Sequence, residues 1–203
     1  MNYASQDKVD TAKNKKKQPK PPKRITARYL YNSGLAYLQR FPASSMHFRF
    51  IMNRKINKSC RHHIDQSHEE CQKLLDDLIV QFKELSLLND SAYLKGMVTS
   101  LRRRGLSSMQ IKNKLMQKGY QTDEVTLEIN SYDEEEGSDK KLSGDHRAIL
   151  IHARKKRLGP FDIEDKKDFN KSLASLARAG FSYDIAKTTL EMSKEDLPEE
   201  FKF

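Results

Sequence analysis

Cysteine and histidine gather in one short stretch of this sequence, and their spacing raises the question of a metal site. The residues are Cys60, His62, His63, His68 and Cys71. Zinc takes four thiolate or imidazole ligands, so two cysteines and two histidines would be enough. However, the stretch has no C-x₂₋₄-C pair, and Cys71 lies on an apolar helical stripe, where a free cysteine commonly packs as a small hydrophobic residue. We therefore predict a polar loop with one core cysteine, no metal and no cofactor.

Consecutive carboxylates at residues 133–136 are the other group that could do chemistry, as a general acid and base. Acid–base catalysis by two carboxylates requires different environments that separate their pKa values. A solvated run offers one environment, so we interpret these residues as part of a linker. His47, His146 and His152 are isolated, and the sequence contains no G-x-S-x-G, G-x-x-x-x-G-K-[ST] or G-x-G-x-x-G motif. These observations predict a protein that is not an enzyme.

Two clusters of basic residues stand at matching places in the sequence, each just before a glycine. They are Arg102, Arg103 and Arg104 before Gly105, and Arg154, Lys155, Lys156 and Arg157 before Gly159. Cations at a helix C-terminus complement the helix dipole, which explains part of each cluster. Three consecutive arginines exceed that need, and Lys112 and Lys118 extend the first cluster along the next predicted helix. We therefore predict a basic stripe that contacts phosphates or acidic side chains of a partner.

The whole chain is basic, with 203 residues and a net charge of +10. Residues 1–24 hold eight lysines or arginines against two aspartates, so we predict a disordered tail, either an electrostatic arm or a solubilising extension. Positive charge favours nucleic acid or an acidic protein surface as partner. No apolar run approaches the roughly 20 residues that a membrane span needs, and the N-terminus lacks the apolar segment of a secretory signal. With only two cysteines, the sequence predicts a cytoplasmic protein without a membrane partner.

The elements that position these residues are predicted to be helices, because apolar residues recur at helical spacing and no stretch alternates like a strand. The clearest stripe is Cys71, Leu75, Leu78, Phe82 and Leu85. Glycine or proline ends several stripes, and serine, threonine, asparagine or aspartate begins them. The pattern divides the chain into three repeats of three helices at residues 25–87, 88–130 and 146–203, with an acidic linker at 131–145.

Three sets of short motifs occur in order along these repeats. The middle repeat has residues 87–93 and 100–105, followed by Ile111, Leu115, Lys118 and Gly119; the first has residues 36–41 with Arg54 and Lys55; the third has residues 153–160 and 176–186. Together these motifs resemble the RecX family of recombinase regulators, and the third set is similar to alphaproteobacterial members. The resemblance covers about residues 25–192, which leaves out only the tails.

The resemblance implies an all-α protein whose three tandem three-helix repeats form an elongated, curved array. RecX-like proteins bind the RecA filament on single-stranded DNA and restrain its ATPase, strand-exchange and coprotease activities in DNA repair and the SOS response; some bind DNA directly. The implied partners are therefore a RecA-type filament and single-stranded DNA, with duplex DNA as a further candidate. Both basic clusters, Lys112, Lys118 and Arg178 become candidate contacts to the filament or its DNA.

The alternative is a DNA-binding transcriptional regulator of the helix-turn-helix type. Such proteins place a recognition helix in the major groove and usually dimerise. Here the basic residues lie at predicted helix ends in several repeats, and no dimerisation stripe stands out. We therefore expect a monomer and favour the regulator of recombinase filaments.

Overall fold

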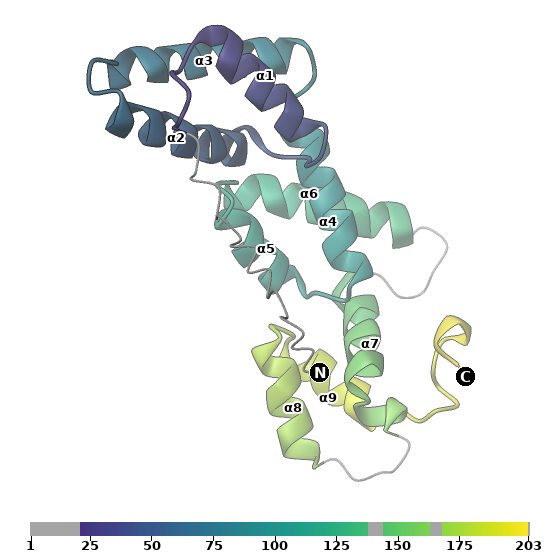
Figure 1. The fold of residues 1–203 in the computed structure, drawn as a ribbon. Coiled ribbons are helices and arrows are strands. Elements are labelled where there is room, and N and C mark those ends of the chain that lie inside the picture. The colour runs from purple at the N-terminus through teal and green to yellow at the C-terminus, as the bar shows by residue number, and fades with distance from the viewer. Residues whose placement is uncertain (1–20, 138–143, 163–167, 203) are drawn as a thin grey trace, which may run out of the picture.

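The computed structural model describes residues 21–137, 144–162 and 168–202. All regular secondary structure within these ranges is helical and consists of nine α-helices and two short 3₁₀-helices. The helices form three small bundles stacked end to end in an elongated array (Figure 1). The prediction of an all-α fold is therefore confirmed. In the ranges described, no helix combines the length and the apolar character needed to cross a membrane.

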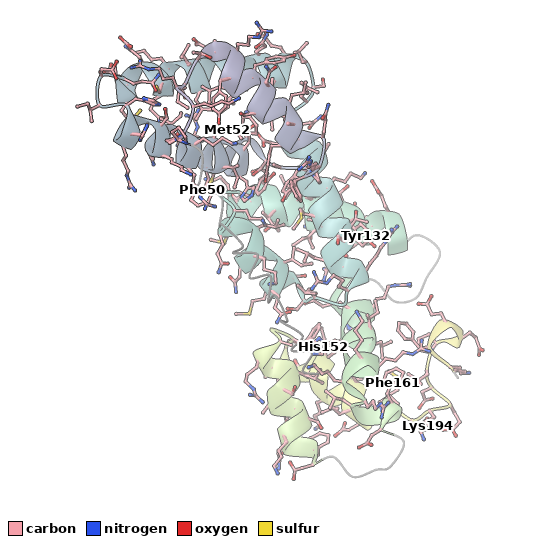
Figure 2. All side chains as sticks on the ribbon, viewed as in Figure 1. Phe50, Met52, Tyr132, His152, Phe161 and Lys194 are labelled. Atoms are coloured by element: carbon pink, nitrogen blue, oxygen red, sulfur yellow. The ribbon has the colours of Figure 1, made fainter. Side chains whose placement is uncertain are left out.

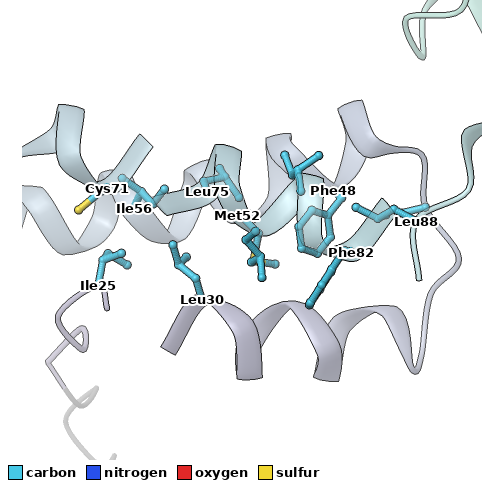
Figure 3. Packing of buried hydrophobic residues seen from close by; sticks show 12 residues of the cluster. Ile25, Leu30, Phe48, Met52, Ile56, Cys71, Leu75, Phe82 and Leu88 are labelled. Atoms are coloured by element: carbon cyan, nitrogen blue, oxygen red, sulfur yellow. The ribbon is translucent and has the colours of Figure 1, made fainter. Parts of the chain in front are cut away.

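The first bundle consists of α1 (Ala27–Leu38), α2 (Ser45–His62) and α3 (His68–Glu84). Its core is built at helical spacing, with Phe48 and Met52 of α2 close to Phe82 of α3 (Figure 3). Gly34 of α1 is buried against these rings, and a Cβ there would lie 2.8 Å from Cζ of Phe48 and 3.0 Å from Cε2 of Phe82. The missing side chain thus lets α1 lie directly on the two aromatic rings, whose centroids are 5.6 Å apart.

The second bundle consists of α4 (Asp90–Arg103), α5 (Ser108–Met116) and α6 (Thr122–Gly137). Its buried core comprises Leu94, Val98, Leu101, Ile111, Leu115, Tyr120, Val125 and Ile129. The side chain of Asn89 accepts a hydrogen bond from the backbone N–H of Ala92, and that of Ser107 accepts one from Gln110. Both side chains satisfy a backbone donor that has no partner within its helix, in agreement with the expectation that asparagine or serine begins such helices.

The third bundle consists of α7 (Gly144–Lys156), η1 (Gly159–Phe161), α8 (Phe169–Arg178), α9 (Tyr183–Glu191) and η2 (Glu199–Phe201). The two 3₁₀-helices insert Phe161 and Phe201 into its core, with ring centroids 6.4 Å apart. This bundle therefore recruits segments outside its three main helices to complete a small apolar core.

The acidic segment 131–145 is not the irregular linker that the sequence predicted. Helix α6 continues through its first half to Gly137, and α7 already begins at Gly144. Glutamate favours helix, and Ile129 and Asp133 are one turn apart on the side of α6 that meets α4, so the helix gains contacts as it continues. Residues 138–143, like residues 1–20 of the predicted tail, lie outside the described residues.

Polar contacts join the bundles at both junctions. Between the first and second bundles, Asp90 accepts a hydrogen bond from the backbone N–H of Ser45 at 2.6 Å and pairs with Lys83 at 3.1 Å. Between the second and third, Ser107 Oγ donates to the carbonyl oxygen of Ala179 at 2.7 Å in a buried position. Hydrogen bonds are directional, so these contacts constrain how each bundle is placed on the next.

Candidate functional site

Arg102 is buried, and this corrects its prediction as part of an exposed basic stripe. Only 4% of the residue is exposed, because it follows Val98 by one helical turn on the core side of α4. Nη1 donates to Asp145 at 2.6 Å, and Nη2 donates to Asp133 at 2.5 Å and to Ser108 Oγ at 2.8 Å. Arg102 therefore connects α4 with α6 and α7 inside the protein and is not available to a partner.

The carboxylates around Arg102 also correct the interpretation of the acidic run as a wholly solvated segment. The side chain of Asp133 is 19% exposed, whereas the next residue, Glu134, faces solvent. Burial raises the pKa of Asp133; the hydrogen bond and charge of Arg102 oppose this rise, and Asp145 adds to it. The charged cluster of Arg102, Asp133 and Asp145 thus belongs to the junction between the second and third bundles.

The other predicted contact residues lie at the surface or are partly exposed. They are Arg103, Arg104, Lys112, Lys118, Arg154, Lys155, Lys156, Arg157 and Arg178. Lys155 Nζ donates to the carbonyl oxygen of Arg104 at 2.9 Å, so the two basic clusters, far apart in sequence, meet where the second and third bundles join. Arg178 Nε donates to the carbonyl oxygen of Ala174 within its own helix. The role of these residues in binding stays a prediction.

A further basic surface, which the sequence analysis did not include among the contact residues, lies along α2. This helix of 18 residues carries Arg49, Arg54, Lys55, Lys58 and Arg61 and no acidic residue. Arg49 pairs with Asp76 of α3, but Arg54, Lys58 and Arg61 form no ion pair with the described residues. The absence of any carboxylate over so long a helix was a signal in the sequence that could have found this surface.

Two adjoining grooves follow these cations, and we refer to them together as the α2 groove. The part of about 400 Å³ is lined by Pro22, Lys23, Tyr29, Ile51, Arg54, Lys55 and Lys58, and the part of about 610 Å³ by Pro22, Arg54, Asn57, Lys58, Arg61 and His62. Lys55 lies over the ring of Tyr29, with Nζ 6.0 Å from the ring centroid. Because none of the described residues that line the α2 groove is a carboxylate, the groove forms a positive track of the kind that holds a phosphate backbone.

The stretch of cysteines and histidines is divided between separate contacts. Cys71 is buried in the core as predicted, with Sγ 4.0 Å from that of Cys60, and burial followed by the Cys60 contact raises the pKa of Cys71 to about 11. His63 Nε2 lies 3.0 Å from the carbonyl oxygen of Pro22. Among the residues with described positions, no three histidines, cysteines or carboxylates are grouped so that they could hold a metal ion. The stretch therefore ties α2 to α3 and to the preceding chain.

Comparison with known proteins places this arrangement in a family, although no family model matches the chain. The "Regulatory protein RecX" of Myxococcus xanthus (strain DK1622) is 32% identical over 182 residues, which span 88% of this chain and 93% of that protein. The chain belongs to the RecX family. The "Regulatory protein RecX" of Agrobacterium fabrum (strain C58 / ATCC 33970) is 30% identical over 127 residues, or 61% of this chain and 63% of that protein. The predicted resemblance to RecX is thereby confirmed.

A solved structure supports the same fold for this RecX family member. The crystal structure of RecX from Lactobacillus salivarius matches with a TM-score of 0.55 at 19% identity, over 81% of this chain and 94% of that chain. At this identity, the match shows a shared fold. Within that fold, Arg102 is buried in a charged cluster, Arg104 and Lys155 meet at the junction between the second and third bundles, and another group of cations is open along the α2 groove.

Proposed function

We propose that this RecX family member is a non-enzymatic regulator that binds the RecA recombinase filament on single-stranded DNA. It inhibits the ATPase, strand-exchange and coprotease activities of the filament during DNA repair and the SOS response, and it acts in the cytoplasm as a monomer. The observation that carries the proposal is the relationship to "Regulatory protein RecX" of M. xanthus, which extends over nearly the whole of both chains.

The stacked bundles suit a protein that lies along a filament. Helices α2, α5 and α8 lie on the same side of the stack, one from each bundle (Figure 1). A body of this form can touch neighbouring protomers at once, and it shifts the filament between states only to the extent that it binds one state more tightly. Inhibition in this proposal is therefore the result of preferential binding to a less active filament.

The α2 groove supports the DNA part of the proposal. Lysines and arginines that contact phosphates position a protein on nucleic acid without reading the sequence, which suits a regulator of a filament that forms on many sequences. Arg54, Lys58 and Arg61 are the proposed backbone contacts in the first bundle. In the other bundles, the proposed contacts to the filament or its DNA are Arg103, Arg104, Lys112, Lys118, Arg154, Lys155, Lys156, Arg157 and Arg178.

The direct test is ATP hydrolysis by RecA filaments on single-stranded DNA, measured as the purified protein is titrated in. Hydrolysis should fall as the protein approaches a stoichiometric ratio to RecA, and unchanged hydrolysis at that ratio would contradict the proposal. The double variant Arg103→Glu, Arg104→Glu should require roughly tenfold more protein for the same inhibition, because it reverses two exposed charges.

A matched control reverses two exposed lysines elsewhere, Lys73 of α3 and Lys95 of α4, each to glutamate. It should inhibit like the unchanged protein. Footprinting on duplex DNA tests the helix-turn-helix alternative, because a sequence-specific regulator protects a defined site whereas the proposed regulator protects none.

A further inference from the structure

A groove of about 570 Å³ opens where the first and second bundles meet, and we refer to it as the junction groove. Apolar side chains from two helices form its floor: Met46 and Phe50 from α2 and Met97 from α4. Phe50 lies on the side of α2 that faces the second bundle (Figure 2). The junction groove is separate from the α2 groove, since the two share no lining residue.

Two of the three apolar side chains in the floor of this groove are largely exposed, and the third, Met97, is partly buried. Phe50 is 59% and Met46 57% exposed. The cause lies in the helical phase of α2: Phe48 and Met52 turn into the core, so Phe50, midway between them, turns outward, and Met46 lies one turn away on the same side. Grouped apolar side chains at a surface mark an interaction site more often than single ones do.

Met46 of the first bundle contacts the second bundle at Gly119. Its thioether lies across the backbone of Gly119, where a Cβ would be 1.8 Å from the sulfur atom. Gly119 also has a φ of +90°, a conformation that residues with a side chain rarely adopt. A glycine at this position therefore both permits this backbone conformation and leaves room for the thioether of Met46. The methionine side chain thereby lies against the turn that follows α5.

Three cations stand around the apolar floor: Arg104, Lys114 and Lys118. None of their charged groups forms an ion pair with the described residues, and no carboxylate lines the groove. A complementary ligand therefore carries negative charge next to bulky apolar groups. The volume is within the range of about 300–1,000 Å³ that is typical of pockets for small ligands, so it has room for a few large side chains.

Single-stranded nucleic acid and an acidic protein segment both match this positive charge. The composition of the floor favours the protein segment. Single strands of nucleic acid bind on rows of aromatic rings, whereas this floor offers one phenyl ring, stacked on His47 at a centroid distance of 6.3 Å, and two thioethers. Methionine side chains are flexible and polarizable and adapt to apolar side chains of a protein partner.

We propose that the junction groove docks an acidic segment of a partner protein through bulky apolar side chains that enter between Phe50, Met46 and Met97. The carboxylates of this segment pair with Arg104, Lys114 and Lys118. The inference goes beyond the proposed function because it names the chemistry of a protein contact, and it holds whether or not that partner is RecA.

Fluorescence anisotropy with a labelled synthetic peptide, in which glutamates alternate with leucine and phenylalanine, tests the proposal without any recombinase. The unchanged protein should bind this probe, and Phe50→Ala or Lys114→Glu should each weaken binding by about tenfold. The matched controls are Leu127→Ala, which removes an exposed apolar side chain of α6, and Lys73→Glu on α3; both should bind like the unchanged protein.

Three outcomes would overturn the proposal: no binding of the peptide, equal binding of a peptide in which lysine replaces glutamate, or binding that Phe50→Ala leaves unchanged. A labelled oligothymidylate serves as the second probe. If Phe50→Ala and Lys114→Glu weaken its binding but not that of the peptide, the groove takes nucleic acid and the proposal is wrong. Inhibition of the RecA ATPase is measured separately, so a failure here is distinguishable from a failure of the proposed function.

Discussion

Arg102 carries a full charge in a place that is almost closed to solvent, and its neighbours explain how the fold accommodates it. Carboxylates from α6 and α7 neutralise the guanidinium, and the Ser108 hydroxyl and the Leu106 carbonyl accept further hydrogen bonds. A buried ion pair adds little net stability over apolar residues of the same size, but removal of one member leaves an uncompensated buried charge. Loss of Arg102 is therefore expected to destabilise the protein chiefly because Asp133 and Asp145 would remain without their cation.

The substitution Arg102→Met is expected to lower the free energy of unfolding by about 3–5 kcal/mol, because Asp133 and Asp145 would lose their common partner. Urea denaturation followed by circular dichroism measures this loss. Arg103→Met is the matched control, since this neighbour is exposed and its substitution should change stability by no more than about 0.5 kcal/mol. Equal losses in the two variants would contradict the burial of Arg102.

The sequence could not separate Arg102 from Arg103 and Arg104, because three consecutive arginines look alike until the phase of the helix is known. Successive residues of a helix point in directions about 100° apart, so one of the three meets the core while the others face solvent. The partners Asp133 and Asp145 lie 31 and 43 residues away along the chain, and local patterns do not reveal such pairings. The row of cations on α2, by contrast, could have been predicted from the helix itself.

Asp90 gives the junction between the first and second bundles a dependence on pH. Burial alone would raise the pKa of Asp90, but the hydrogen bond from the backbone N–H of Ser45 and the ion pair with Lys83 outweigh it and lower this pKa. A carboxylate whose pKa is lowered by folding stabilises the protein above its unfolded pKa of about 3.9 and loses this contribution as the pH falls further. The stabilisation is therefore present at neutral pH and is lost in acid.

Asp90→Asn is expected to cost about 1 kcal/mol of stability at pH 7, and this cost should shrink as the pH falls below the unfolded pKa of about 3.9 and through the lowered pKa of the folded carboxyl. Urea denaturation across this range measures the difference between the two proteins. Asp77→Asn, at an exposed position of α3, is the control and should show no such trend. A difference that stays constant with pH would mean that the charge of Asp90 does not support the junction.

At the scale of the helices, the starts of α4 and α5 were predictable because a cap is a local feature. Asn89 and Ser107 each precede a helix and bond to a backbone N–H three residues later, which the sequence alone suggests. The continuation of α6 into the acidic run was not predictable in this way, since it involves the contact of Asp133 with Arg102, which lies 31 residues away along the chain. Local rules thus account for where these helices begin, and a tertiary contact accounts for the continuation of α6 through Asp133.

Ser107 caps α5 and also makes a hydrogen bond to the third bundle. Its Oγ accepts from the backbone N–H of Gln110 and also donates to the buried carbonyl of Ala179 in the third bundle. Ser107→Ala is expected to lower the free energy of unfolding by about 2–3 kcal/mol, of which about 1 kcal/mol is the lost cap and the rest the unsatisfied carbonyl. Chemical denaturation measures this loss.

The serine that caps α9 provides the comparison. Ser182 accepts from the backbone N–H of Ile185 and is exposed, so Ser182→Ala should cost only about 1 kcal/mol. If both substitutions had the same cost, the hydrogen bond from Ser107 to Ala179 would contribute nothing to the joining of the bundles.

For the molecule as a whole, an arrangement in several small cores could be predicted, whereas the placement of one bundle on the next could not. Each bundle has its own apolar cluster, which follows from periodic stripes in its own segment. The contacts between bundles join residues that are 45 and 72 positions apart, at Ser45 with Asp90 and at Ser107 with Ala179. The junction groove depends on structure at this level, since its lining combines residues of two bundles, whereas the α2 groove is lined by the first bundle and the chain that precedes it.

DNA binding by the whole molecule is expected to depend on where its positive charge lies and not on the net charge alone. The triple variant Arg54→Glu, Lys58→Glu, Arg61→Glu reverses three cations of the α2 groove. It should weaken binding of a labelled oligothymidylate and make the slope of log affinity against log salt concentration shallower by about 2, since each phosphate contact to a single strand contributes about 0.7. Fluorescence anisotropy at a series of salt concentrations measures both quantities.

The control is a triple variant with the same change in net charge, Lys73→Glu, Lys95→Glu, Lys187→Glu. These lysines are exposed on α3, α4 and α9, and each has a carboxylate partner at the surface. Such surface pairs contribute at most about 1 kcal/mol, so the fold should tolerate the changes, and the salt dependence should equal that of the unchanged protein. If both variants lost the same slope, DNA would respond to the overall charge of +10, and the α2 groove would not be the binding site.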